Sequence, residues 1–151
     1  MRGCTRGNRY VVGELATLRG QVVDALRTAS APHTDWAVLD QPVDGLTPPA
    51  FIVMWSEPML FGPTTSCVYS AGVDIRIVST RVEPGVGLDV LELMVETAVS
   101  ALVEARHPIR QVSKPAPYDV DGVRYQSVVA LCTATVSITQ PALLAASNGG
   151  H

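Results

Sequence analysis

The sequence predicts an α+β fold, a two-layer sandwich in which two helices pack on one face of a mainly antiparallel sheet. Two segments repeat apolar residues at the spacing of a helix face, and several shorter runs have the composition or alternation of strands. The order is helix, two or three strands, helix, two strands, without an internal repeat. The 151 residues suit one domain, expected over residues 13–140 between a basic arm (1–12) and a flexible tail (141–151).

The first helix is expected over residues 13–29 and ends before Pro32. Gly13 and Gly20 weaken this prediction, because a glycine in a helix interior costs up to about 1 kcal/mol relative to alanine. The apolar stripe that indicates the helix consists of Leu15, Leu18, Val22, Leu26 and Ala29.

Two or three strands are expected next, in three candidate segments. Trp36–Leu39 is short and precedes the turn-rich stretch Gln41–Pro49. The apolar run Ala50–Trp55 lies between prolines and is too short for a typical helix, which predicts a strand buried on both faces. From Cys67 to Ile77 apolar residues occupy the odd positions, so this strand has one covered face.

The second half of the chain predicts one helix and further strands. A stripe of apolar residues over 88–102, between Pro84-Gly85 and Pro108, indicates the helix. The segment Ile109–Tyr118 is expected at a sheet edge, because Pro115 and Pro117 cannot donate hydrogen bonds. Asp121-Gly122 is a favoured hairpin turn, and the β-rich run Val123–Thr139 follows it.

Composition bounds the class of protein. Hydrophobic residues make up 47% and charged residues 17%, which excludes a disordered chain. The longest apolar run, Ala50–Trp55, is far shorter than the roughly 20 residues that cross a bilayer. No secretory segment follows the N-terminal arginines, so synthesis in a cytoplasm is expected. We expect the cysteines, Cys4, Cys67 and Cys132, to be reduced and structural.

Charge is unevenly distributed along the chain. Residues 1–30 carry a net charge of +3, residues 31–104 one of −8, and residues 105–151 one of +2. Such segregation is compatible with separate solvated faces, and it also suits a head-to-tail oligomer in which unlike surfaces meet. The acidic middle argues against binding nucleic acid over a broad surface. Only the basic arm, with Arg2, Arg6 and Arg9, is suited to touch DNA.

The side chains that could carry chemistry do not form a catalytic pattern. The histidines, His33, His107 and His151, have no metal-ligand spacing and no neighbouring nucleophile. Cys67 or Cys132 could pair with His107 in a thiol enzyme, but both cysteines share the period of buried neighbours. We therefore expect no enzyme, no metal and no cofactor.

Two features instead predict contacts with other chains. Asp89, Glu92 and Glu96 line one flank of the second predicted helix, where charged side chains are normally solvated. The expected loop Ser56–Ser66 carries Met59, Leu60 and Phe61 in a row, although connecting loops rarely expose bulky apolar residues. Two interpretations stay open for this loop: it folds over its own core, or it meets another chain.

The order of these segments resembles that of the tail terminator proteins of long-tailed bacteriophages, especially those of actinobacterial phages. The similarity covers roughly residues 15–140. It lies in the order and residue composition of the segments more than in an invariant motif. The residues that carry it are 18–27, Thr47–Val53, Cys67–Ile77, Leu88–Leu102 and Pro115–Tyr125.

The resemblance implies a non-enzymatic ring, usually of six copies, at the junction of tail and neck in the virion. Such a ring caps the tail tube, ends its polymerisation and joins the tail to the head connector. The implied partners are further copies, the major tail tube protein and head–tail connector proteins, with no membrane and with a passing contact to DNA left open. Two alternatives remain: another neck or head-completion protein of the same virion, and a small intracellular ligand-binding domain or enzyme.

Overall fold

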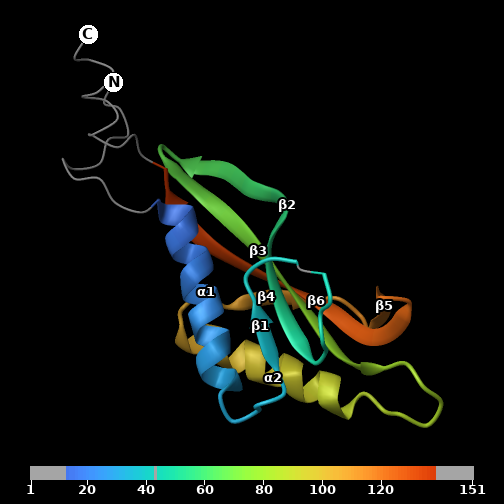
Figure 1. Cartoon of the computed structure of the whole chain (residues 1–151). Coiled ribbons are helices and arrows are strands. Elements are labelled where there is room, and N and C mark those ends of the chain that lie inside the picture. The colour runs from blue at the N-terminus through green and yellow to red at the C-terminus, as the bar shows by residue number, and fades with distance from the viewer. Residues whose placement is uncertain (1–12, 43, 139–151) are drawn as a thin grey trace.

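The computed structural model describes residues 13–42 and 44–138. It has the predicted α+β sandwich, with helices α1 (Glu14–Ser30) and α2 (Asp89–Glu104) crossing each other on one face of a six-stranded sheet (Figure 1). The strands are β1 (Ala37–Leu39), β2 (Ala50–Thr65), β3 (Val68–Arg81), β4 (Ile109–Val112), β5 (Ala116–Val120) and β6 (Val123–Ser137).

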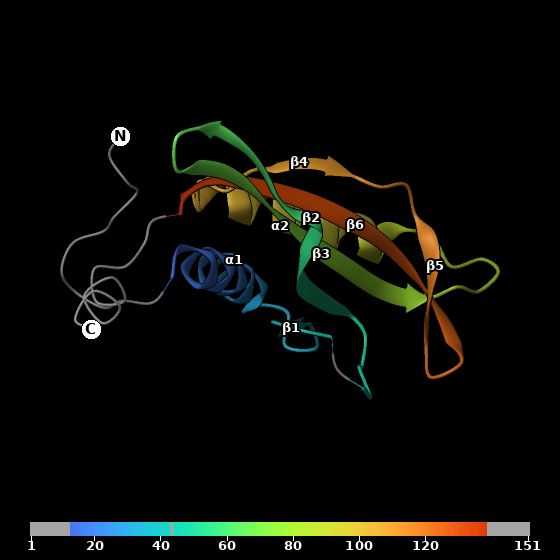
Figure 2. The same cartoon turned by 90° about the horizontal axis from the view of Figure 1, so that it is seen from above.

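The sheet is antiparallel except at one edge. Strand order is β1-β2-β3-β6-β4, with β5 also paired to β6, and only β1 runs parallel to its neighbour. β1 and β4 therefore lie at opposite edges of the sheet (Figure 2). α1 contacts β1, β2 and β6, whereas α2 contacts β3, β4 and β6. Each sheet edge is thus accompanied by a different helix.

The core lies between the sheet and the helices. Phe51 and Val53 of β2 face it together with the odd-numbered residues of β3 and the even-numbered residues of β6. Each helix adds one stripe of apolar residues to the core. The alternating residues of the strands and the helical stripes therefore form one hydrophobic cluster. The helical stripes consist of Leu18, Val22, Val23 and Leu26 in α1 and Leu91, Met94, Ala98 and Leu102 in α2.

Both helices agree with the sequence prediction to within two residues at each end. Gly20 lies inside α1, and a Cβ placed there would meet no atom within 4 Å. Helical structure at this position therefore depends on the packing of the neighbouring turns against the sheet.

The strand pattern of β3 is confirmed, because Ala71, Val73, Ile75 and Ile77 are all buried. For β2 the expected burial on both faces holds from Ala50 to Val53. β1 also lies where a short strand is predicted.

The prediction of a loop over Ser56–Ser66 is wrong. β2 continues to Thr65 and pairs with β3 again at Leu60, Phe61 and Thr65, so the chain reverses at Ser66 and Cys67. The pairing shifts register between Trp55 and Leu60 and again between Phe61 and Thr65. Pro58 and Pro63 lie in these two irregular stretches, where no ladder hydrogen bond is required of them. Proline therefore marks bulges here and not the end of the strand.

The edge formed by β4 and β5 agrees with the prediction for residues 109–118. Both strands pair with β6, and Ser113 bridges the break between them. Its backbone N–H donates to the Val129 carbonyl, and its hydroxyl accepts from the Val129 N–H, each at 2.9 Å. Asp121 and Gly122 form the predicted hairpin turn, with φ angles of 51° and 81°.

Candidate interaction surfaces

The first candidate surface, here the α2–β4 side, combines an acidic helix flank with a basic strand edge. Glu92 and Glu96 lie on α2 and are exposed, as is Asp89 in its first turn. Arg110 on β4 and Lys114 just beyond it are exposed too, and the sequence from 105 to 118 contains no acidic residue. The acidic residues therefore belong to the helix layer and the basic residues to the sheet layer.

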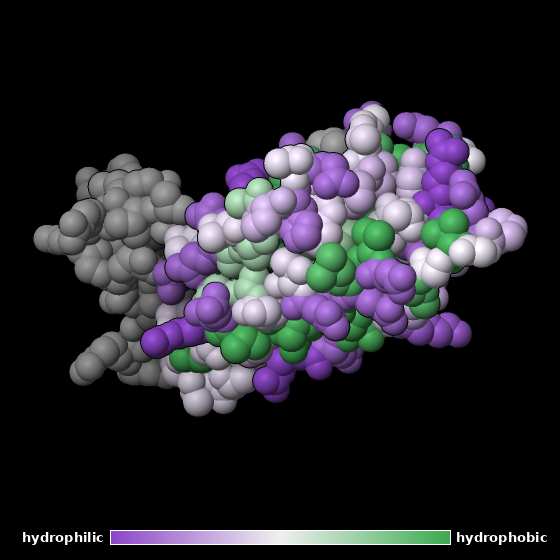
Figure 3. Space-filling model, turned by 90° about the horizontal axis from the view of Figure 1, so that it is seen from below, coloured by the Kyte–Doolittle hydropathy of each residue, from purple (hydrophilic) through white to green (hydrophobic). Residues whose placement is uncertain are grey.

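An apolar groove of about 430 Å³ separates these two charged rows. Leu88 and Val112 contribute to its wall with exposed fractions of 37% each, and Glu92 and Glu96 also line it. Viewed from the side on which α2 lies, hydrophobic side chains form an interrupted band among hydrophilic ones (Figure 3). The α2–β4 side thus offers apolar area bordered by charge, as contact surfaces between proteins often do.

The second surface, here the α1–β1 side, has the opposite arrangement. Asp35 and Asp40 are exposed on either side of β1, and the sequence from 31 to 50 contains no lysine or arginine. Asp44, further along the chain, is exposed too but lines a small pocket with Tyr118 and Asp119 of β5. In the helix layer α1 carries Arg19 and, more than two turns later, the exposed Arg27. The Arg27 guanidinium donates to the Val38 carbonyl of β1 at 3.4 Å, which places it at this edge.

Sequence reasoning found the acidic flank of α2 but missed the pair of aspartates, Asp35 and Asp40, beside β1. The available signal was the absence of bases from 31–50 and of acids from 105–118. What it could not supply was the placement of these segments at opposite sheet edges, because that follows from the strand order.

The apolar residues Met59, Leu60 and Phe61 separate in the fold. Leu60 pairs with the buried Ala71 and packs against the core. For this residue, the interpretation that the segment folds over its own core holds. Met59 is half-buried. Phe61 is 38% exposed and lies on the open face of the sheet, which is turned away from the helices.

Gly72 makes room for this arrangement. It lies opposite the bulged residues 56–59. Because its neighbours in β3 point to the core, a side chain at position 72 would point to the open face. A Cβ at this position would overlap the Ser56 side chain and lie 3.2 Å from Cε2 of Phe61. The bulge is held by a hydrogen bond from the Ser56 hydroxyl to the Pro58 carbonyl at 2.6 Å.

Charged groups also occupy the open face. The Arg76 guanidinium lies 4.4 Å from the centre of the Tyr118 ring, a cation–π contact between β3 and β5. Asp74 stands between Met54 and Leu131 on the neighbouring strands. Burial raises the pKa of its carboxyl, and the nearby Arg76 opposes that shift.

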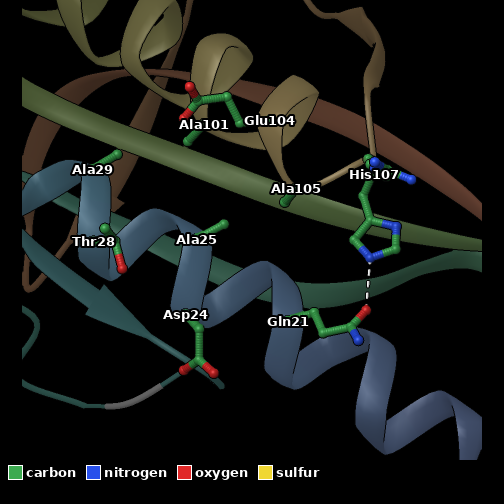
Figure 4. A pocket seen from close by; sticks show the side chains of 10 residues that line it. Gln21, Asp24, Ala25, Thr28, Ala29, Ala101, Glu104, Ala105 and His107 are labelled. Carbon is green, nitrogen blue, oxygen red and sulfur yellow. Dashed lines mark hydrogen bonds between the residues drawn. The ribbon is translucent and has the colours of Figure 1, made fainter.

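A second groove, of about 730 Å³, runs between the two helices. Its floor contains small side chains such as Ala25 and Ala101, and it is spanned by a hydrogen bond of 2.7 Å between His107 Nε2 and Gln21 Oε1 (Figure 4). Burial lowers the pKa of the His107 imidazole, and its Nδ1 atom is buried without a hydrogen-bond partner. His107 therefore connects the two helices as a neutral ring near pH 7.

The cysteines differ from one another. Cys67 is disulfide-bonded, which corrects the expectation that all three thiols are reduced. Cys132 is free and buried, and its thiol donates to the backbone carbonyl of His107 at 3.0 Å and not to the imidazole. Burial raises its pKa to about 11, so this thiol is protonated at neutral pH.

Comparison with known proteins leaves the family open. No protein-family model matches the sequence, and no curated protein is similar to it. Within residues 13–42 and 44–138, no three His, Cys, Asp or Glu side chains are placed to hold a metal ion. No helix in this part of the chain has the length and apolarity to span a membrane. The arm with Arg2, Arg6 and Arg9 and the tail 141–151 lie outside the described residues.

Proposed function

We propose that this chain is the subunit of a tail-terminator ring in a long-tailed bacteriophage. In that role it is made in the host cytoplasm and assembled into the virion at the tail–neck junction. It caps the tail tube, ends tube polymerisation and joins the tail to the connector of the head. Its part is structural, without catalysis or cofactor.

One observation carries the proposal: the molecule has two unlike sides with complementary charge. A ring closed by head-to-tail contacts needs two different surfaces on every subunit. The α2–β4 side and the α1–β1 side lie at opposite edges of one sheet and differ in both layers. The resemblance of residues 15–140 to tail terminators supports the further step from a ring to this particular ring.

Electron microscopy and light scattering test the proposal together. The purified chain is measured alone and after addition to tail tubes polymerised from the major tail tube protein. A ring at the tube tip, and tubes that stop growing when the chain is added, are the expected results. A chain that stays monomeric in both conditions and leaves tube growth unchanged would refute it.

The same experiment separates the neck-protein alternative. A head-completion protein would bind the portal complex and ignore the free tube tip. Parallel sedimentation with portal complexes and with tubes therefore shows which end of the junction the chain recognises first. Binding to the portal alone would replace the terminator proposal by this alternative.

A further inference from the structure

The two sides of the molecule are complementary layer by layer. On the α2–β4 side, Glu92 and Glu96 belong to the helix layer, and Arg110 and Lys114 belong to the sheet layer. The α1–β1 side has the reverse arrangement, with arginines in its helix layer and aspartates in its sheet layer. Asp24, an exposed acid of α1, lines the groove between the helices.

We infer that the α2–β4 side of one subunit docks against the α1–β1 side of a second copy. In this contact the sheet layer of one subunit lies beside the sheet layer of its neighbour, and the helix layer beside the helix layer. This inference rests on the proposed function and names the interface of the proposed ring. In this arrangement β4 bases meet β1 aspartates, and α2 glutamates meet α1 arginines. Complementary charges of this kind determine orientation and partner choice in an interface.

The contact is made by side chains and not by adding strand to strand. β1 has only three residues, and the Arg27 side chain already donates to its Val38 carbonyl. β4 has four residues, and β5 behind it contains Pro117. Short or proline-bearing edges are the usual protection against backbone pairing between sheets.

A head-to-tail contact gives the charged residues of both sides oppositely charged partners. A symmetric pair uses only one of the two sides. Two copies joined through their α2–β4 sides would leave Asp35 and Asp40 without basic partners. The apolar groove also favours contact with a second chain, because the exposed Leu88 and Val112 would then leave water.

Two charge-reversal variants of the full chain test the interface. The first, Arg110→Glu with Lys114→Glu, makes the β4 edge acidic, and the second, Asp35→Lys with Asp40→Lys, makes the β1 edge basic. These four side chains are exposed, so both variants should fold, which circular dichroism checks. Each alone places like charges in the contact and should need more than about tenfold higher concentration than wild type to assemble.

The decisive step mixes the two variants. Alternating them around a ring restores opposite charges at every sheet-layer contact, so an equimolar mixture should assemble like the wild type. A matched control, Glu57→Lys with Glu83→Lys, changes two exposed acids that lie outside β1, β4 and both helices, and it should assemble without loss. Wild-type assembly should also weaken as salt screens the charges.

The outcomes separate the two proposals. If the wild type assembles, and each variant alone assembles equally well, the interface is wrong and the ring stands. The interface is likewise wrong if the mixture assembles no better than its parts. If only the β4 variant is defective, the contact is a symmetric pair that closes at two copies, and the interface and the ring both fail. If the wild type neither assembles nor binds tail tubes, the proposed function fails, and the interface fails with it.

Discussion

Replacing Gly72 by alanine should destabilise the fold although no buried side chain is removed. The added Cβ would overlap the Ser56 hydroxyl and lie 3.1 Å from Ser56 Cβ and 3.2 Å from Phe61 Cε2. The hydroxyl and the Phe61 ring can rotate away, but Ser56 Cβ moves only if the bulge of β2 shifts. Overfilling a packed site costs about 1–3 kcal/mol, so we expect the melting temperature to fall by roughly 2–12 °C.

Thermal and urea unfolding followed by circular dichroism measure this change, and Gly20→Ala is the matched control. The same atom is added there, but it meets nothing within 4 Å and lies inside α1. Alanine should therefore stabilise the protein by roughly 0.5–1 kcal/mol at position 20. Opposite signs for one chemical change would show that space, and not glycine itself, decides the effect.

A second variant tests the cause directly. Ser56→Gly removes both Ser56 atoms that crowd the new Cβ, at the expense of the hydrogen bond to Pro58, which is worth about 0.5–1.5 kcal/mol. In this background Gly72→Ala should cost less than half of what it costs in the wild type. Equal losses in both backgrounds would refute the reasoning, because the double-mutant cycle then shows no coupling between positions 56 and 72.

The remaining predictions concern packing, thiol access and pH. Leu60→Ala should lower the free energy of unfolding by about 1–3 kcal/mol in urea titrations, and Phe61→Ala should lower it by less, because 38% of Phe61 is exposed on the open face; a larger loss for Phe61→Ala would contradict their opposite placement. Iodoacetamide should modify the buried, protonated Cys132 only when denaturant is added, and rapid labelling of the native protein would contradict this. Because burial lowers the pKa of His107, its contribution to stability is full above the unfolded pKa of about 6.5 and decreases as the pH falls below it. His107→Gln should flatten the pH dependence of the melting temperature in that window, and an unchanged slope would contradict the assignment.

The regular elements could be predicted because each carries its own local pattern. The three-and-four stripe of α2 and the alternation from Cys67 to Ile77 both report one buried face, and one buried face is all that a two-layer sandwich requires. The Asp121-Gly122 turn was equally accessible, since two consecutive residues with positive φ favour this pair.

The bulged half of β2 could not be predicted in the same way. Its prolines indicated a loop, and its continuation as a strand depends on Gly72, which lies on a different strand and admits the bulge. The disulfide at Cys67 also had no local signal. For the candidate surfaces, charge counts along the chain found the α2 flank, but only the strand order separates the acidic β1 edge from the basic β4 edge.

The break between β4 and β5 bears on how large an assembly of this chain can become. At Ser113 a side chain takes the place of a backbone acceptor opposite Val129, and Pro117 follows within the next strand. An incoming strand would find no continuous row of donors and acceptors to copy, which discourages fibres that grow by repeated strand addition. Self-association through this edge is then restricted to contacts whose geometry the side chains set, and contacts of that kind can close on themselves after a fixed number of copies.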